Sequence, residues 1–144
     1  DLLGIEFKGD YMLSDYVKSG LTFTYTFGDL TKEDGSKEPA DRVPPATGIF
    51  YVNYSPIDNL SIRPQARYAF SHRRISEDEI SDIRISENGT DGFINIQILA
   101  NYQPTESINL KVIADNLADA AYREHASSLD GMGRNITLSV NYSF

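Results

Sequence analysis

The chain has 144 residues, 40% of them hydrophobic, with no cysteine and a net charge of -8. A chain of this size supports about one structural unit, and its negative charge argues against nucleic acid as a partner. The lack of cysteine excludes disulfides and thiolate metal sites. No stretch approaches the roughly 18 apolar residues of a membrane helix, but a membrane-barrel strand needs only about ten residues with alternate ones apolar.

The first half of the chain contains four segments in which apolar and polar residues alternate. They lie near residues 3–7, 21–27, 50–54 and 60–70. This period of two is typical of β-strands that present one face to an apolar environment. Pro64 falls inside the fourth segment, and because proline lacks a backbone N–H we expect a β-bulge there.

Three further segments alternate in the second half, at 94–102, 108–114 and 135–144. The last is the most regular, since an apolar residue fills every second position: Ile136, Leu138, Val140, Tyr142 and Phe144. Seven strands are therefore predicted. Aromatic residues near the strand ends fit the girdles that membrane barrels place at the two bilayer interfaces.

The connections between these segments alternate between short and long. Short ones are expected at 9–15, 56–59 and 104–107, and long polar ones at 29–45, 72–91 and 117–131. Membrane barrels have short turns on one side and large loops on the other. We therefore predict an all-β fold, an antiparallel up-and-down transmembrane β-barrel segment with about seven strands of a larger barrel. A soluble β-sandwich also alternates and is one alternative, and a small closed outer-membrane barrel with a structural or adhesive role is another.

The end of the chain carries the most specific motifs. These are Asp115-Asn116-Leu117-Ala118-Asp119, Ala121-Tyr122-Arg123-Glu124-His125, Gly133-Arg134-Asn135 and the terminal Tyr142-Ser143-Phe144. In these motifs the chain resembles the C-terminal part of a TonB-dependent outer-membrane receptor. The resemblance implies that residues 1–144 form the C-terminal portion of a barrel of about 22 strands in the bacterial outer membrane. It also implies a plug domain and a TonB-engaging segment that have no counterpart here.

The resemblance further implies uptake of a metal chelate, with an iron-siderophore complex as the leading cargo and energy from the TonB complex. Vitamin B12, haem, copper or an oligosaccharide would fit the same residues. Arginine pairs bidentately with carboxylate or catecholate oxygens, which makes basic and aromatic groups the candidate ligand contacts. They are Tyr51, Arg67, Arg73, Arg74, Arg84, Tyr122, His125 and Arg134. The alternative for Arg63 and Arg67 is a salt-bridge network with Glu6 or Asp115.

The sequence predicts no enzyme, no cofactor and no metal site. His72 and His125 fall in different long connections, and no nucleophile or phosphate-binding motif is present. The acidic residues around Glu79 do not have the spacing of an EF-hand. The resemblance gives the terminal strand another role, because the alternating residues from Ile136 to Phe144 would be the signal for the barrel-assembly machinery. The expected partners are thus this machinery, membrane lipid, the TonB complex and the ligand.

Overall fold

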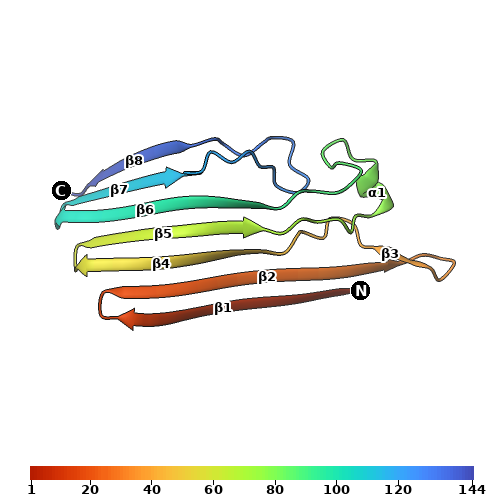
Figure 1. The fold of residues 1–144 in the computed structure, drawn as a ribbon, viewed down its shortest axis with the longest axis horizontal. Helices are drawn as coiled ribbons and strands as arrows, with labels where there is room; N and C mark the ends of the chain where they lie inside the picture. Colours follow the sequence, from red (N-terminus) through yellow and green to blue (C-terminus); the bar gives the residue numbers. More distant parts are fainter.

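The computed structural model describes every residue from Asp1 to Phe144 as one antiparallel sheet with almost no helix (Figure 1). The strands are β1 (Leu2–Ser14), β2 (Val17–Thr31), β3 (Lys37–Pro39), β4 (Thr47–Ile57), β5 (Leu60–Ala69), β6 (Phe93–Thr105), β7 (Ile108–Asp115) and β8 (Asn135–Tyr142). Their order in space is β1-β2-β4-β5-β6-β7-β8, while β3 pairs only with β2. This arrangement confirms the predicted all-β, up-and-down fold and its seven successive strands. The hairpin strand β3 and the single-turn helix α1 (Glu77–Ile80) were not expected.

Five of the seven successive strands are longer than the alternating segments, and the turns are correspondingly shorter, whereas β5 and β8 end one and two residues earlier than expected. β1 continues to Ser14, so the first turn contains only Asp15 and Tyr16 rather than residues 9–15. The other two short turns lie at 58–59 and 106–107. All three occupy one end of the sheet, and the long connections occupy the other (Figure 1). The predicted alternation of short and long connections is therefore confirmed.

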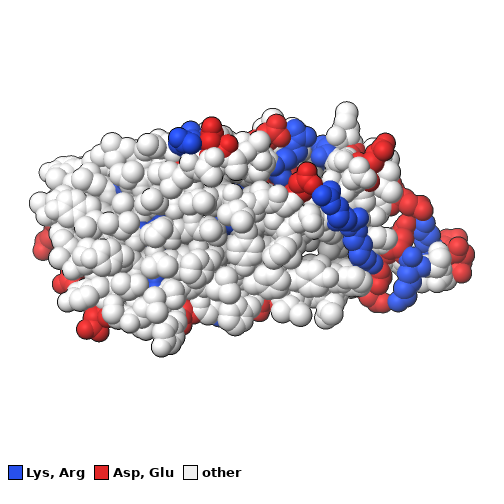
Figure 2. Space-filling model, in the orientation of Figure 1, with Lys and Arg blue, Asp and Glu red and all other residues white.

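The pairing register separates the two faces of the sheet chemically. Phe7 lies opposite Phe23, and Tyr68 opposite Ile94, so the apolar positions of neighbouring strands share one face. Figure 2 shows a face of the sheet whose strands carry almost no charged side chains. Arg67 pairs with Asn95 on the other face. Because side chains alternate along every strand, the sequence pattern alone produces one apolar and one polar surface.

The sheet neither closes nor packs against a second layer. β1 and β8 each pair with only one neighbour, and they do not pair with each other. The buried hydrophobic residues are only Val43, Ala69 and Ile85. A sandwich needs two sheets and a small barrel needs a closed one, so this chain forms neither alternative. No helix of the structure is long and apolar enough to cross a membrane.

The expected bulge at Pro64 is wrong. Pro64 pairs in register with Ile98 of β6, and the pairs on either side keep the same register. On its other side β5 pairs with β4, where the residues between Tyr51 and Tyr54 of β4 have no partner in β5. The register is the same before and after this gap. The missing N–H thus interrupts the ladder locally, and the unbroken pairing with β6 keeps the strand from bending.

Candidate functional site at the loop end

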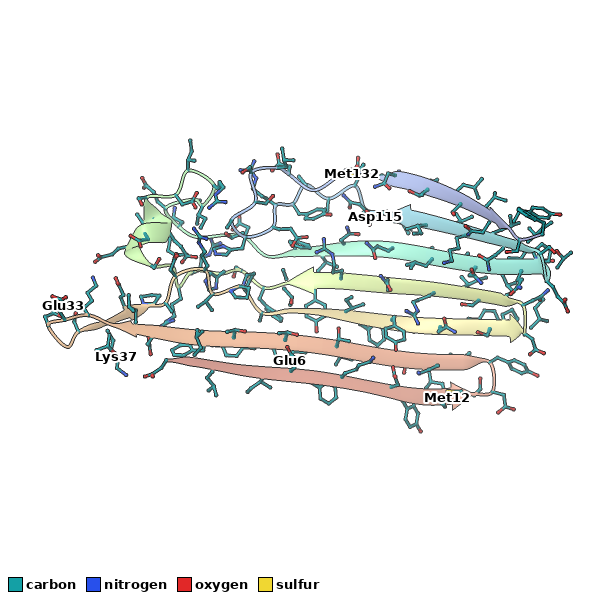
Figure 3. The ribbon with its side chains drawn as sticks, turned by 180° about the vertical axis from the view of Figure 1, so that it is seen from behind. Glu6, Met12, Glu33, Lys37, Asp115 and Met132 are labelled. Carbon is teal, nitrogen blue, oxygen red and sulfur yellow. The ribbon has the colours of Figure 1, made fainter.

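Three long loops gather at one end of the sheet, and we refer to this region as the loop end. The first long loop follows β2 and contains β3 (residues 32–46), the second joins β5 to β6 (70–92), and the third joins β7 to β8 (116–134). Figure 3 shows Glu33 and Lys37 at the tip of the β2–β3 hairpin, with Met12 at the opposite end of the sheet. Binding residues in the loops would therefore face one side of a membrane.

The second long loop is ordered by a capped single turn of helix. The Ser76 hydroxyl accepts from the Glu79 N–H at 3.1 Å, and the Glu79 carboxylate accepts from the Ser76 N–H at 2.9 Å. This is a capping box, and its Ser-x-x-Glu spacing was present in the sequence but was not used in the prediction. The box buries Glu79 and fixes its carboxylate. The other acidic residues of this loop have separate roles, since Glu77 pairs with Lys32 and Asp82 pairs with Arg84.

Glu79 lies beside both histidines of the chain. His125 Nε2 is 2.9 Å from Glu79 Oε1, and His125 Nδ1 is 2.8 Å from the Thr90 hydroxyl. The rings of His72 and His125 meet edge to face with their centroids 4.9 Å apart. The structure thus brings together two histidines that the sequence places in different loops. Their ligand atoms and a Glu79 oxygen all lie within 4.8 Å of one another.

Burial and hydrogen bonding set the charges of this cluster. Burial lowers the pKa of His72 below its ordinary value, the nearby His125 lowers it further, and Glu79 only partly opposes this. Burial alone would raise the pKa of Glu79. Hydrogen bonds from the Ser76 N–H and from His125 outweigh this effect, so that the pKa of Glu79 falls below its ordinary value. The cluster therefore favours a neutral His72 beside an ionised Glu79.

Gly89 fixes the position of His72. Gly89 has a φ of 82°, a backbone conformation that residues other than glycine rarely adopt. A Cβ at this position would lie 2.0 Å from the His72 carbonyl oxygen. The next residue, Thr90, exchanges two backbone hydrogen bonds with His72, each 2.8 Å long. The same short segment therefore supports His72 through its backbone and His125 through the Thr90 side chain.

Asn116 anchors the third long loop. Its side chain is fully buried, and its amide donates to the carbonyls of Ala120 and Met132, each at 2.9 Å. Its side-chain oxygen accepts from the Ala120 N–H, and its backbone N–H donates to Asn95. With a φ of 50°, Asn116 also turns the chain sharply out of β7. Asn116 of the Asp-Asn-Leu motif thus holds the two ends of the third long loop together through its hydrogen bonds.

Most of the predicted ligand arginines are held in ion pairs within the protein. Arg67 contacts Glu124 at 2.6 Å and the Tyr122 hydroxyl at 3.4 Å, so the network expected with Glu6 or Asp115 is wrong. The remaining pairs join Arg73 to Asp91, Arg74 to Asp29 and Arg84 to Asp82. The Glu6 and Asp115 pairings fail because the third long loop places Glu124 over the end of β5. Arg67 and Arg74 thus join separate elements, whereas Arg73 and Arg84 pair with carboxylates of their own loop.

Tyr51 and Arg134 lie away from this loop network. The Tyr51 hydroxyl donates to Asp10, and Arg63 stacks over the Tyr51 ring with its guanidinium 4.3 Å from the centroid. Arg134, at the exposed end of the third long loop, forms no salt bridge. The structure therefore does not bring the eight predicted residues into one site.

Two cavities at the loop end bring some of the predicted residues together. One, of about 270 Å³, is lined by Arg84 and His125, and also by Arg42 and Arg123, which were not among the predicted residues. The other, of about 340 Å³, is lined by Arg84, Tyr122 and Arg123. Arg42 was not predicted because it reaches the cavity only once the first long loop has folded against the third long loop. Arg123 was not predicted because its motif indicated the family resemblance and gave no sign of a ligand contact.

The residues expected to direct barrel assembly lie along the edge strand β8. Ile136, Leu138, Val140 and Tyr142 all project from the apolar face and are 61–74% exposed, and Phe144 follows the strand end. β8 is an edge strand with one unpaired side, and its exposed apolar side chains form a continuous apolar face. That geometry is compatible with contact by lipid or by another protein strand.

Comparisons with known proteins agree with this architecture. No family model matches the sequence, and no curated protein matches it significantly. Among solved structures, copper transporter OprC matches over 99% of this chain with a TM-score of 0.85 and 22% identity. The siderophore receptor PiuA from Acinetobacter baumannii and the ferric-catecholate import receptor Fiu from E. coli each match over 98%, with TM-scores of 0.65 and 0.63 and 18% identity.

These matches concern part of larger proteins. The chain spans 24% of the OprC chain, 21% of the PiuA chain and 20% of the Fiu chain. By name, OprC is a copper transporter, PiuA a siderophore receptor and Fiu a ferric-catecholate import receptor. The chain therefore has the fold of part of these transporter and receptor structures, in agreement with the barrel fold that the resemblance to TonB-dependent receptors implies.

Proposed function

We propose that residues 1–144 form the C-terminal portion of the barrel wall of a TonB-dependent receptor in the bacterial outer membrane. The observation that carries this proposal is an open sheet with one apolar and one polar face, which matches receptor barrels almost from end to end. The unpaired edges of β1 and β8 would continue into further strands, because unpaired backbone groups are costly in lipid. The apolar face would contact lipid and the polar face the barrel interior.

The proposed cargo is a metal chelate, taken up with energy from the TonB complex through parts of the receptor outside this chain. An iron-siderophore complex remains the first candidate, because PiuA is named a siderophore receptor and Fiu a ferric-catecholate import receptor. Copper is the second candidate, because the match to the copper transporter has the higher TM-score. Arg42, Arg84 and Arg123 line the 270 Å³ cavity, and each is paired with a carboxylate, of Asp41, Asp82 and Asp130 respectively. An anionic chelate would bind these guanidinium groups in place of the carboxylates.

The proposed role of β8 is recognition by the barrel-assembly machinery. The apolar residues from Ile136 to Tyr142, with Phe144 after them, form the exposed edge that such a partner would extend by strand pairing. Replacing Phe144 in the full-length protein should lower the amount of receptor in the outer membrane without changing uptake per receptor molecule.

Membrane topology can be tested with single cysteines, because the chain has none of its own. In the full-length protein, Asn88→Cys places a thiol in the second long loop, and Asn59→Cys places one in a two-residue turn. A membrane-impermeant maleimide should label Asn88→Cys on intact cells and Asn59→Cys only after the outer membrane is permeabilised. Equal labelling of both on intact cells would contradict the proposed topology.

The cargo is tested separately by uptake in cells that express or lack the full-length protein. Radiolabelled ferric-siderophore and copper salts should be compared, each with and without a functional TonB. TonB-dependent accumulation of iron would support the first candidate, and accumulation of copper the second. If neither metal accumulates, the proposal of metal uptake fails even where the topology is confirmed.

A further inference from the structure

We propose that His72, Glu79 and His125 bind a zinc ion that fastens the second long loop to the third. Two imidazole nitrogens and one carboxylate oxygen are the three protein ligands of known zinc sites, in which a water molecule takes the fourth position. Here the three donors lie within 4.8 Å of one another and come from loops that are far apart in the sequence. The site adjoins the proposed cargo cavity through His125, but the proposal of zinc binding does not depend on the uptake of cargo.

The first argument is an unpartnered nitrogen. His72 Nε2 is buried and has no hydrogen-bond partner, which is uncommon in folded proteins and calls for an explanation. A metal ion would accept the free lone pair that this nitrogen carries when the imidazole is neutral.

The second argument is that hydrogen bonds already orient the other two ligands. If His125 Nε2 binds the ion, its Nδ1–H donates to the Thr90 hydroxyl 2.8 Å away, which fixes the ring. The Glu79 carboxylate accepts from the Ser76 and Arg42 N–H groups at 2.9 and 3.2 Å. Metal sites commonly position their ligands through such secondary contacts.

The third argument is that the geometry needs only a small adjustment. Ligands of a tetrahedral zinc ion lie about 3.3 Å apart, given bonds of about 2.0 Å. His125 Nε2 and Glu79 Oε1 would separate by about 0.4 Å from their present 2.9 Å. Any other pair, being at most 4.8 Å apart, would close by no more than about 1.5 Å. Changes of side-chain torsions suffice for such movements.

The burial of the ligands favours a zinc ion with a structural role over a metal ion bound as cargo. The side chains of Glu79 and His125 are only 3% and 7% exposed, and both lie between loops rather than on an open surface. An ion held there would exchange slowly and would bridge the loop that contains His72 and Glu79 to the loop that contains His125. The site is therefore suited to stabilising the loop end.

The test is zinc binding by the full-length protein, purified in detergent and stripped with a chelator. Calorimetric titration with Zn²⁺ and a count of bound metal should give one zinc ion at this site. The variant His72→Phe keeps an aromatic ring but removes the ligand, and should lower the affinity of that site more than about 100-fold. Thr90→Val should weaken it by about 10-fold. The matched control Asp82→Asn removes another carboxylate of the same loop and should leave zinc binding unchanged.

A second measurement on the unaltered protein does not depend on any variant. Added Zn²⁺ should slow hydrogen exchange in the second and third long loops, because the ion links them, while exchange in the strands stays the same. If the unaltered protein binds no zinc, if His72→Phe binds it equally well, or if zinc leaves loop exchange unchanged, the proposal is wrong. None of these results bears on topology or uptake, so this site and the proposed function can fail independently.

Discussion

The strands and the loop end are stabilised in different ways. Of the 74 backbone hydrogen bonds, 56 lie within strands or the helix. The seven paired strands, which we call the wall, are therefore held together mainly by backbone hydrogen bonds between neighbouring strands. At the loop end, regular pairing is replaced by particular side chains, such as Asn116, Glu79 and the arginine-carboxylate pairs. The wall therefore depends on a pattern of residues, and the loop end depends on the identity of individual residues.

This difference predicts different responses to substitution. In the strands, most residues that keep the polarity of their face should be tolerated, because the ladder uses only backbone groups. Gly20 and Gly48 are exceptions, since a Cβ there would lie 2.3 Å from Tyr51 and from the Thr22 carbonyl oxygen respectively. At the loop end, a replacement of similar size should still loosen a loop if it removes a buried hydrogen-bond partner. The following predictions test this contrast, from the largest expected effect to the smallest.

The largest effect is expected from a charge on the apolar face of β8. Leu138 is 67% exposed on that face, and its neighbour Thr137 projects from the polar face opposite Ile113. In the full-length protein in lipid vesicles, Leu138→Arg should lower the free energy of unfolding by about 2–4 kcal/mol. Thr137→Arg, the same side chain one position away, should change it by less than about 1 kcal/mol. Urea titration followed by tyrosine fluorescence measures both, and equal losses would contradict a lipid-facing surface.

A smaller, local effect is expected at Asn116. Asn116→Ala removes the buried side chain that donates to the carbonyls of Ala120 and Met132, and should lower the free energy of opening of the third long loop by about 2 kcal/mol. Hydrogen exchange of residues 116–134 should rise while strand exchange does not. Asn88→Ala, in the exposed part of the second loop, is the control and should have no effect. Global unfolding of Asn116→Ala at lower urea would show that wall and loop end are one cooperative unit.

The wall was predictable from the sequence because its signal is local. Alternation of residues such as those between Ile136 and Tyr142 reports directly on which face each side chain occupies, and the pairing register confirmed it. The exact ends of the strands were predicted less well. β1 runs to Ser14, and its alternation continues beyond Phe7 through Tyr11 and Leu13, so the turn expected from residue 9 ended this strand too early.

The loop end could be predicted only in part. Ser76 and Glu79 form a capping box that the sequence displayed, so the helical turn could have been found. The meeting of His72 with His125 could not, because it depends on how two loops about 50 residues apart fold over the sheet. For the same reason the arginines were assigned to a ligand, although the structure gives most of them carboxylate partners within the chain.

A smaller effect is expected from breaking the ion pair between Arg74 and Asp29, which tests whether Arg74 stabilises the loop or binds the ligand. Arg74 also donates to the Gly28 carbonyl at 2.6 Å and lies 4.1 Å from the centroid of the Phe27 ring, so it ties the second long loop to the end of β2. A double-mutant cycle with Arg74→Gln and Asp29→Asn should give a coupling of about 1 kcal/mol in loop opening, because both groups are only partly buried. A change in the KM for uptake with no coupling would instead assign Arg74 to the ligand.

The smallest effect is expected at the tip of the β2–β3 hairpin, where Asp34 accepts from the Ser36 hydroxyl at 2.6 Å and from the Ser36 N–H at 2.9 Å. These bonds lower the pKa of Asp34 below its ordinary value of 3.8. Because the folded-state pKa is the lower one, the stabilisation is complete above pH 3.8 and is lost as the pH falls through the folded value. Hydrogen-exchange protection of the tip should therefore decline only below pH 3.8. In Asp34→Asn the amide oxygen can still accept these bonds but does not titrate, so protection that falls equally in both proteins would assign the change to another group.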